Sequence, residues 1–192
     1  MNLYEYNDLR IEVSDDPTYK VGSADNKTKY SKHYFGDGAK DYPTSKHSIK
    51  IFKYDELQND CIIIGSGGAT GVQKESSLIS DDEILVCCCN TVFCLSIDDL
   101  QCKWLTRADQ ATCFGIYVLG EHYITHGEIE ISKLDKSGNI VWQFGGSDTF
   151  VSFDEDNAFK LNADNIELKD FYGVKYKIDF DGNVLWSSHN NN

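Results

Sequence analysis

The chain is poor in basic side chains, and this deficit excludes whole classes of partner. Its 192 residues contain 18 Lys and Arg against 31 Asp and Glu, a formal net charge of −13. Proteins bind nucleic acids and anionic membranes with Lys and Arg that neutralise phosphate. We therefore expect no nucleic acid and no membrane as a partner. An acidic surface suits solubility or a basic protein.

Long apolar runs and a cationic start are also missing. No stretch approaches the ~20 apolar residues that cross a bilayer, and residues 1–10 lack the charged start and apolar core of a secretory signal. The sequence therefore predicts a cytoplasmic protein.

The cysteines lack the spacing of a metal site or a disulfide framework. There are seven, an odd number, and no two are separated by two residues as zinc ligands often are. In a reducing compartment they should stay thiols. Cys87 and Cys89 share one face of a strand, and free cysteine packs as a small apolar residue. We predict core packing for them, and neither a metal nor a cofactor for the chain.

A repeated hairpin is the main feature that the sequence does contain. Residues 131–142 and 176–186 each read as a strand, an Asp/Gly/Asn turn and a second strand that ends in Trp. Gly-Asn between β-branched and apolar residues is a strong hairpin signal. No segment has a helical period, so we expect almost no helix.

The tryptophans mark a longer cycle of strands. They are separated by 38 and 44 residues and are Trp104, Trp142 and Trp186. A weaker copy lies upstream, where residues 55–58 match residues 98–101 and Cys61 stands in the place of Trp104. Periods of about 40 to 50 residues with several strands are typical of propeller blades. We expect each indole to be buried between its own sheet and the next one.

These patterns predict one all-β domain over residues 1–192. Its architecture should be a small or partial β-propeller-like array of about four antiparallel sheet units, which either closes or stays open. Residues 15–46 are rich in polar residues and predict a long loop or irregular insertion. Residues 188–192 predict a disordered tail.

Two segments, residues 134–142 and 178–186, resemble the PQQ-like repeat. This repeat is the blade motif of quinoprotein dehydrogenases and of non-enzymatic propellers that act as protein scaffolds. The resemblance covers roughly residues 84–188 and implies four-stranded antiparallel blades with a tryptophan docked between neighbours. The chain has material for about four blades instead of seven or eight, and the cofactor and calcium residues of the quinoproteins cannot be placed on it. The resemblance thus implies the fold and not the redox activity.

A glycine-rich stretch and two side chains suggest an alternative site. Gly65–Gly71 follows a strand as a dinucleotide loop does, but Thr70 stands where the third glycine belongs and a strand follows, so a turn between blades is favoured. His126 should face solvent, because Ile129 and Ile131 alternate toward the core. Cys113 with His126 as a nucleophile and base stays an open alternative.

Acidic residues cluster at the predicted turns, so they should gather on the rims of the blades. The candidates for partner binding are Asp81, Asp82, Glu83, Asp98, Asp99, Asp154, Glu155 and Asp156. They serve either turn chemistry and solubility or the steering of a basic protein.

These observations favour a non-enzymatic protein-interaction module with an acidic surface that binds a basic partner. One version is an immunity-type protein that neutralises a toxin. Two alternatives stay open: a small-ligand-binding protein or enzyme with a site near Gly65–Gly71, Cys113 and His126, and a structural fragment that completes its barrel by forming an oligomer.

Overall fold

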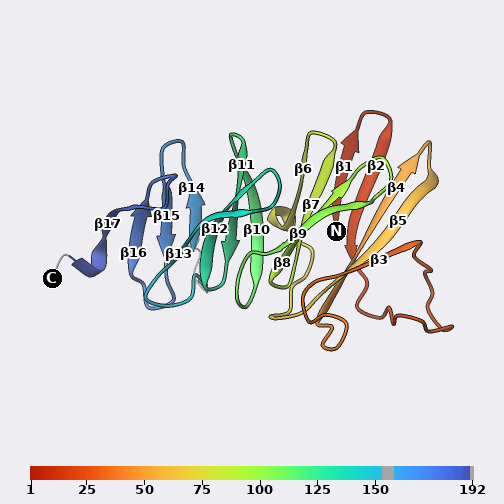
Figure 1. Cartoon of the computed structure of the whole chain (residues 1–192), viewed down its shortest axis with the longest axis horizontal. Helices are drawn as coiled ribbons and strands as arrows, with labels where there is room; N and C mark the ends of the chain where they lie inside the picture. The colour runs from red at the N-terminus through yellow and green to blue at the C-terminus, as the bar shows by residue number, and fades with distance from the viewer. Residues whose placement is uncertain (153–157, 191–192) are drawn as a thin grey trace.

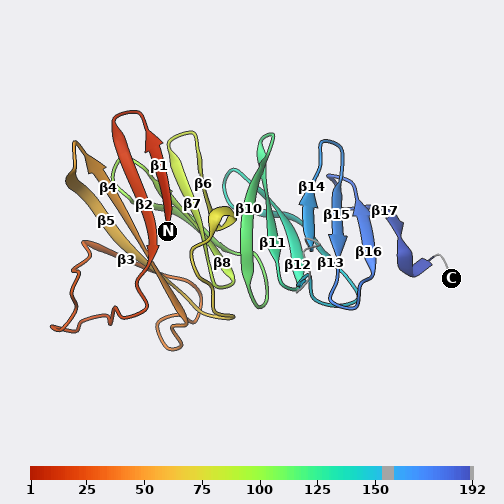
Figure 2. The same ribbon diagram turned by 180° about the vertical axis from the view of Figure 1, so that it is seen from behind.

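Four β-sheets stand side by side and make up nearly all of the protein. The computed structural model describes residues 1–152 and 158–190. The sheets follow one another in chain order along the long axis, from the red and orange first sheet to the blue last sheet (Figure 1), and the view from behind shows the same row (Figure 2). In this described part the only helical elements are two 3-10 turns, η1 (Lys74–Ser76) and η2 (Ser188–Asn190). The prediction of an all-β, propeller-like array of four sheet units is confirmed.

Each of the last three sheets is an antiparallel meander of four consecutive strands. The second sheet contains β6 (Ser77–Ser80), β7 (Glu83–Cys88), β8 (Thr91–Ser96) and β9 (Cys102–Arg107). The third contains β10 (Cys113–Leu119), β11 (His122–Gly127), β12 (Glu130–Asp135) and β13 (Ile140–Gly145). The fourth contains β14 (Phe159–Leu161), β15 (Ile166–Lys169), β16 (Lys175–Ile178) and β17 (Val184–Ser187).

The first sheet has a fifth strand that the sequence did not predict. Its order is β1-β2-β4-β5-β3, with the bounds β1 (Asn2–Tyr6), β2 (Leu9–Asp15), β3 (Lys32–Phe35), β4 (Ser45–Lys53) and β5 (Glu56–Gly65). Strand β3 pairs in parallel with β5 and is the only strand within residues 16–44. The rest of this excursion is irregular but packed: Tyr19, Tyr30 and Ala39 are buried against Ile62 and Ile64 of β5. It therefore covers part of the outward face of the first sheet.

In the third and fourth sheets, the turns that join the last two strands share one hydrogen-bonding pattern. At β12–β13, Oδ1 of Asp135 accepts from the backbone N–H of Ser137 (2.8 Å) and of Asn139 (2.9 Å). At β16–β17, Asp179 accepts the two equivalent bonds. Asp and Asn are favoured in turns because they bond their own backbone in this way. The local sequence therefore specifies both hairpins.

Two indoles join neighbouring sheets through these turns. Trp104 on β9 donates its Nε1–H to the carbonyl of Lys136 in the third sheet, at 3.1 Å. Trp142 on β13 donates in the same way to the carbonyl of Phe180 in the fourth sheet, also at 3.1 Å. Each indole lies on the turn of the sheet that follows its own, as the repeat predicted.

Glycine makes room for these indoles. A Cβ on Gly138 would lie 2.4 Å from the ring of Trp104, and one on Gly182 would lie 2.9 Å from the ring of Trp142. Both glycines also have a φ of about +80°, at +82° and +83°, a conformation that L side chains rarely adopt. The glycine of each turn thus serves the hairpin and the contact between sheets together.

Trp186 occupies the same position on β17 but has no sheet to cover. All three tryptophans pair with a third-strand residue that directly precedes a break in register: Cys94, Lys133 and Lys177. The Trp186 residue is 46% exposed. The expectation that every indole is buried between two sheets is therefore wrong for Trp186, because no sheet follows the fourth one among the described residues.

In the first sheet a tyrosine makes the contact that tryptophan makes elsewhere. Tyr34 of β3 donates its hydroxyl to the carbonyl of Leu100, at the β8–β9 turn, at 2.8 Å. Cys61 lies on the fourth strand as the repeat predicted, but it is buried in the core between the first two sheets. The extra strand β3 lies beyond β5 and takes over this contact at the outer edge of the sheet.

A buried carboxylate fixes the connection between the second and third sheets. Asp109 is 1% exposed. Its Oδ1 accepts from the N–H of Ala111 (2.6 Å) and of Thr112 (2.8 Å), and its Oδ2 accepts from that of Ile129 (2.9 Å) and of Glu130 (2.8 Å). These four hydrogen bonds stabilise the carboxylate of Asp109, which is buried away from water.

Candidate functional site

The acidic residues of the second sheet lie at one edge of it. Asp81 and Asp82 form the β6–β7 turn, and Asp98 and Asp99 form the β8–β9 turn. In an antiparallel meander the turn after the first strand and the turn after the third strand lie at the same edge, and the N–H of Ile97 accordingly donates to the carbonyl of Asp82 at 2.9 Å. All four aspartates are exposed.

The same edge of every sheet carries exposed carboxylates. Figure 1 shows the hairpin turns β1–β2, β6–β7, β10–β11 and β14–β15 along one side of the array. We call this side the acidic rim and define it by its exposed carboxylates, which are Asp8, Asp55, Glu56, Asp81, Asp82, Asp98, Asp99, Glu121, Asp164 and Asp181.

Some of the predicted partner-binding carboxylates are engaged within the chain. Glu83 has a side chain only 16% exposed and lies 2.9 Å from Nζ of Lys103, which also lies 3.5 Å from Asp82. Asp81 lies 3.4 Å from Nζ of Lys136. Asp98 and Asp99 form no ion pair in the described part of the chain. Asp154, Glu155 and Asp156 fall outside the described residues, and a role of the whole set in binding stays a prediction.

Cys113 and His126 lie on opposite faces of the third sheet. Sγ of Cys113 is buried 3.2 Å from Sγ of Cys87, in the core that faces the second sheet. The ring of His126 faces the fourth sheet and stacks on Phe159, with centroids 5.0 Å apart and planes 14° apart. The structure therefore does not bring this pair together as a nucleophile and base.

The expectation that His126 faces solvent is wrong. The imidazole packs between the third and fourth sheets. Because the third sheet has a neighbouring sheet on each face, the alternation of side chains along its strands does not identify solvent-exposed positions. Burial lowers the pKa of His126, although its hydrogen bond to the carbonyl of Phe150 and the charge of Asp109 act in the opposite direction. The ring is therefore neutral near pH 7.

The glycine-rich stretch Gly65–Gly71 is shaped for packing between sheets. A Cβ on Gly65 would lie 2.5 Å from the carbonyl oxygen of Cys88, and one on Gly67 would lie 2.5 Å from that of Ala111. The stretch leads into η1, a single 3-10 turn, whereas a dinucleotide loop opens a long helix. The turn between blades accounts for its glycines.

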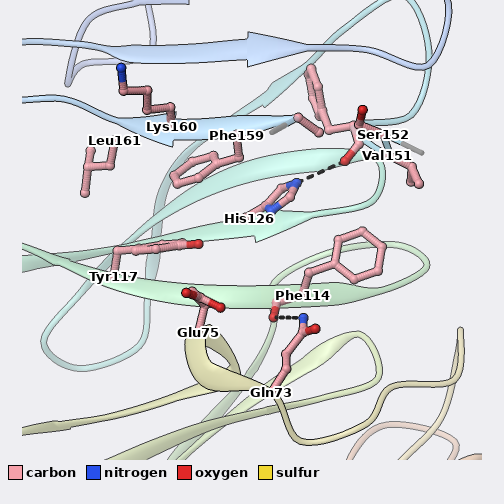
Figure 3. Close-up of a pocket in the computed structure, with 12 residues that line it drawn as sticks. Gln73, Glu75, Phe114, Tyr117, His126, Val151, Ser152, Phe159, Lys160 and Leu161 are labelled. Atoms are coloured by element: carbon pink, nitrogen blue, oxygen red, sulfur yellow. Dashed lines mark hydrogen bonds between the residues drawn. The ribbon is translucent and has the colours of Figure 1, made fainter. Parts of the chain in front are cut away.

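His126 also lines a cleft of about 650 Å³ between η1 and the third and fourth sheets. Figure 3 shows Tyr117, His126 and Phe159 side by side, with Glu75 opposite Tyr117. Tyr117 stacks on Phe159 with centroids 4.8 Å apart, and burial raises the pKa of Tyr117 to about 12. Nε2 of His126 donates to the carbonyl of Phe150 at 3.0 Å, which leaves Nδ1 as an acceptor.

This cleft has the size and composition of a small-molecule site, with aromatic walls and a few polar groups. Sequence reasoning found only His126 of this set. Glu75, Tyr117 and Phe159 come from three separate elements, and no spacing in the sequence indicates that they meet. Among the described residues no group of three or more His, Cys, Asp or Glu side chains could hold a metal ion. That same part of the chain has no helix long and apolar enough to cross a membrane.

Comparison with known proteins supports the fold. No protein-family model matches the chain, and no curated protein matches it. Among solved structures it is similar to the computationally designed Ika8 protein, with 10% identity and a TM-score of 0.51 over 74% of this chain and 45% of that one. It is also similar to the WD40 β-propeller domain of Doa1, with 14% identity and a TM-score of 0.50 over 74% of this chain and 48% of that one. The chain thus spans less than half the length of either structure, and at these identities the likeness shows the fold alone.

Proposed function

Given this propeller-like fold, we propose that the chain is a non-enzymatic protein-interaction module whose acidic rim binds a basic protein. The supporting observation is the acidic rim itself, where exposed carboxylates from all four sheets share one side of the array. A surface of one sign raises the rate of encounter with an oppositely charged partner and disfavours like-charged ones.

Two partly buried aspartates in the β12–β13 and β16–β17 turns add negative charge beside the acidic rim. The side chain of Asn139 is the main reason that the pKa of Asp135 lies below its usual value, and Asn183 has the same effect on Asp179. Both aspartate side chains therefore stay ionised well below neutral pH.

The finer identity of the module is also part of the proposal. We assign the chain to the PQQ-like repeat proteins on the two Asp-x-x-Gly-Asn hairpins that end in Trp. A basic toxin domain neutralised in the cytoplasm is the partner that best fits a small module with a net charge of −13.

A pair of matched variants tests the rim. Asp98→Asn with Asp99→Asn removes two rim charges that no ion pair in the described structure uses, and Asn keeps the turn bond that Asp99 accepts from Gln101. Asp37→Asn with Asp41→Asn removes the same charge from exposed positions within residues 16–44. Each variant is used to capture basic proteins from the source lysate at about 50 mM and about 500 mM salt, which bracket strong and weak screening.

A rim contact predicts that one basic protein is captured by the wild type and the control variant. The rim variant and high salt should both release it. Equal capture by the rim variant would show that the rim is not the contact.

Ligand binding in the cleft is a second candidate, favoured by its volume and aromatic walls. Glu75 is the exposed carboxylate at the cleft, so small aromatic amines are the matching class of ligand. A thermal-shift series with such amines should raise the Tm of the wild type and not that of Glu75→Gln. A series without any shift would remove this candidate.

A further inference from the structure

Two buried cysteines from different sheets meet in the core between the second and third sheets. Sγ of Cys87, on the inner strand β7, lies 3.2 Å from Sγ of Cys113, at the start of β10. The two residues are 1% and 0% exposed. Neither the acidic rim nor the cleft involves this pair of thiols.

A β-bulge turns Cys113 toward the second sheet. Ile116 of β10 packs in the same core as Cys87, whereas Tyr117 packs in the core shared with the fourth sheet. Side chains alternate between the two faces of a regular strand, so regular pairing would turn residue 113 toward the fourth sheet. The pairing of β10 with β11 shifts between Cys113 and Gly115, and this shift returns Cys113 to the face that carries Ile116. The bulge therefore brings the two thiols together.

Backbone hydrogen bonds hold the two strands at this point. The N–H of Cys113 donates to the carbonyl of Cys89 at 2.6 Å, and the N–H of Ala108 donates to the carbonyl of Asn90 at 2.9 Å. Both acceptors lie in the β7–β8 turn, just beyond Cys87. The positions that carry the two sulfurs are thus fixed relative to each other.

Apolar packing explains why these thiols are buried but not why their sulfurs meet. Free cysteine packs as a small apolar residue, and Cys94 in the same core does so without a hydrogen bond to another sulfur in the described part of the chain. The sulfurs of a disulfide are about 2.05 Å apart. Closing a bond between Cys87 and Cys113 therefore requires a movement of about 1.2 Å, which small side-chain rotations supply.

We propose that Cys87 and Cys113 are a site of reversible oxidation, at which a peroxide joins the two thiols in a disulfide that links the second sheet to the third. One peroxide oxygen is first transferred to one sulfur, which becomes a sulfenic acid, and the other oxygen leaves as water. The second thiol then attacks this sulfur, and the hydroxyl group leaves with the thiol proton as a second water. Two electrons thus pass from the sulfurs to the O–O bond. A reducing thiol reverses the change by exchange.

The surroundings of the pair make the oxidation slow. The hydrogen bond to Cys113 and burial raise the pKa of Cys87. Because the thiolate is the reactive form, the folded protein should react mainly through brief local openings between the sheets. The site should therefore respond to prolonged exposure to peroxide.

Peptide mapping of the wild-type chain tests the bond directly. The reduced, folded protein is incubated with hydrogen peroxide for several hours, the remaining thiols are alkylated in denaturant, and the chain is cut with trypsin. Trypsin places the two cysteines in separate peptides, residues 75–103 and 108–133. A second sample is folded from urea in a mixture of reduced and oxidised glutathione, so that access to the buried pair does not limit the reaction.

The expected product is one pair of linked peptides, which a reducing agent separates. Fragmentation of the linked pair should place the bond between Cys87 and Cys113. If the bond is absent from both samples, or if Cys113 is joined to another cysteine, the proposal is overturned.

Thermal unfolding measures whether the bond strengthens the contact between the sheets. A disulfide that joins positions 26 apart in the sequence should raise the Tm of the wild type by about 5–10 °C over the reduced protein. Cys113→Ala cannot form the bond, so peroxide should not raise its Tm. Cys94→Ala removes a thiol from the same core and should keep the full response.

Circular dichroism checks that both variants are folded. Linked wild-type protein with an unchanged Tm would overturn the proposal, as would a folded Cys94→Ala variant that has lost the response. The bond does not involve the acidic rim, so the outcome of this test is separate from that of the proposed function.

Discussion

Trp142 and Trp186 form a natural pair for testing what holds the row of sheets together. They have the same position at the same kind of register break, on β13 and β17. Trp142 lies between two sheets and donates to the carbonyl of Phe180 at 3.1 Å, whereas Trp186 is 46% exposed and covers no sheet. Substitution by alanine at each position therefore measures the contact between sheets against a matched background.

The expected difference follows from these contacts. Replacing a buried Trp by Ala costs about 3–5 kcal/mol, and a lost hydrogen bond accounts for about 1 kcal/mol. Because Trp142 is only partly buried, we expect Trp142→Ala to lower the free energy of unfolding by about 3 kcal/mol, near the lower limit. Trp186→Ala should lower it by about 1 kcal/mol or less, as for other half-exposed side chains.

Urea unfolding followed by circular dichroism measures both losses, at a protein concentration where sedimentation shows the monomer. Trp104→Ala, whose indole donates to Lys136, should resemble Trp142→Ala. Equal losses at Trp142 and Trp186 would refute the reasoning, because the turn of the following sheet would then contribute nothing.

Three further predictions concern buried groups. Asp109→Ala should lower the free energy of unfolding by about 3 kcal/mol or more in urea, because four backbone N–H groups lose their acceptor; an unchanged midpoint would contradict the assigned bonds. Burial lowers the pKa of His126, so the contribution of the neutral ring to the free energy of unfolding is fully present above about pH 6.5. It is lost as the pH falls, because the unfolded chain then takes up a proton that the folded site disfavours. Unfolding between pH 7.5 and 5.5 should accordingly show a steeper loss of stability for wild type than for His126→Gln, by up to about 1.4 kcal/mol per pH unit, and parallel curves would argue against a buried neutral ring. Cys102 is the one partly exposed cysteine of seven, so brief alkylation of the folded protein should add at most one label by mass, and all seven only in denaturant; several labels on the folded protein would contradict the buried thiols.

The elements that the sequence predicted are those specified by local chemistry. The Asp-x-x-Gly-Asn turns close within five residues, so the hairpins at Asp135 and Asp179, and with them the repeat, could be read directly. The fourth copy at residues 55–58 follows from its local match to residues 98–101, and the structure places it at the end of the β4–β5 turn and the start of β5.

The features that were missed depend on pairing across long stretches of chain. Strand β3 pairs with β5, about 29 residues later, so nothing near Tyr34 indicates that it replaces a tryptophan. The alternation of side chains along the strand placed His126 in solvent, because that rule assumes that one face of the sheet is exposed to solvent. A sheet between two others has no such face. The walls of the cleft come from η1, β10, β11 and β14, which no linear spacing relates.

The arrangement of one sheet per continuous stretch of chain has a consequence for folding. Every strand pair except β2 with β4 and β3 with β5 joins strands that are consecutive in the chain, so most backbone pairing is closed soon after its residues are synthesised. Short loops of this kind favour rapid formation of each hairpin, and the contacts of Trp104 and Trp142 then align one finished sheet on the next. During translation the row should assemble in order from its first sheet. A gene that gained or lost about 40 residues at one of the connecting segments would change the length of the row without disturbing any hydrogen-bonded sheet.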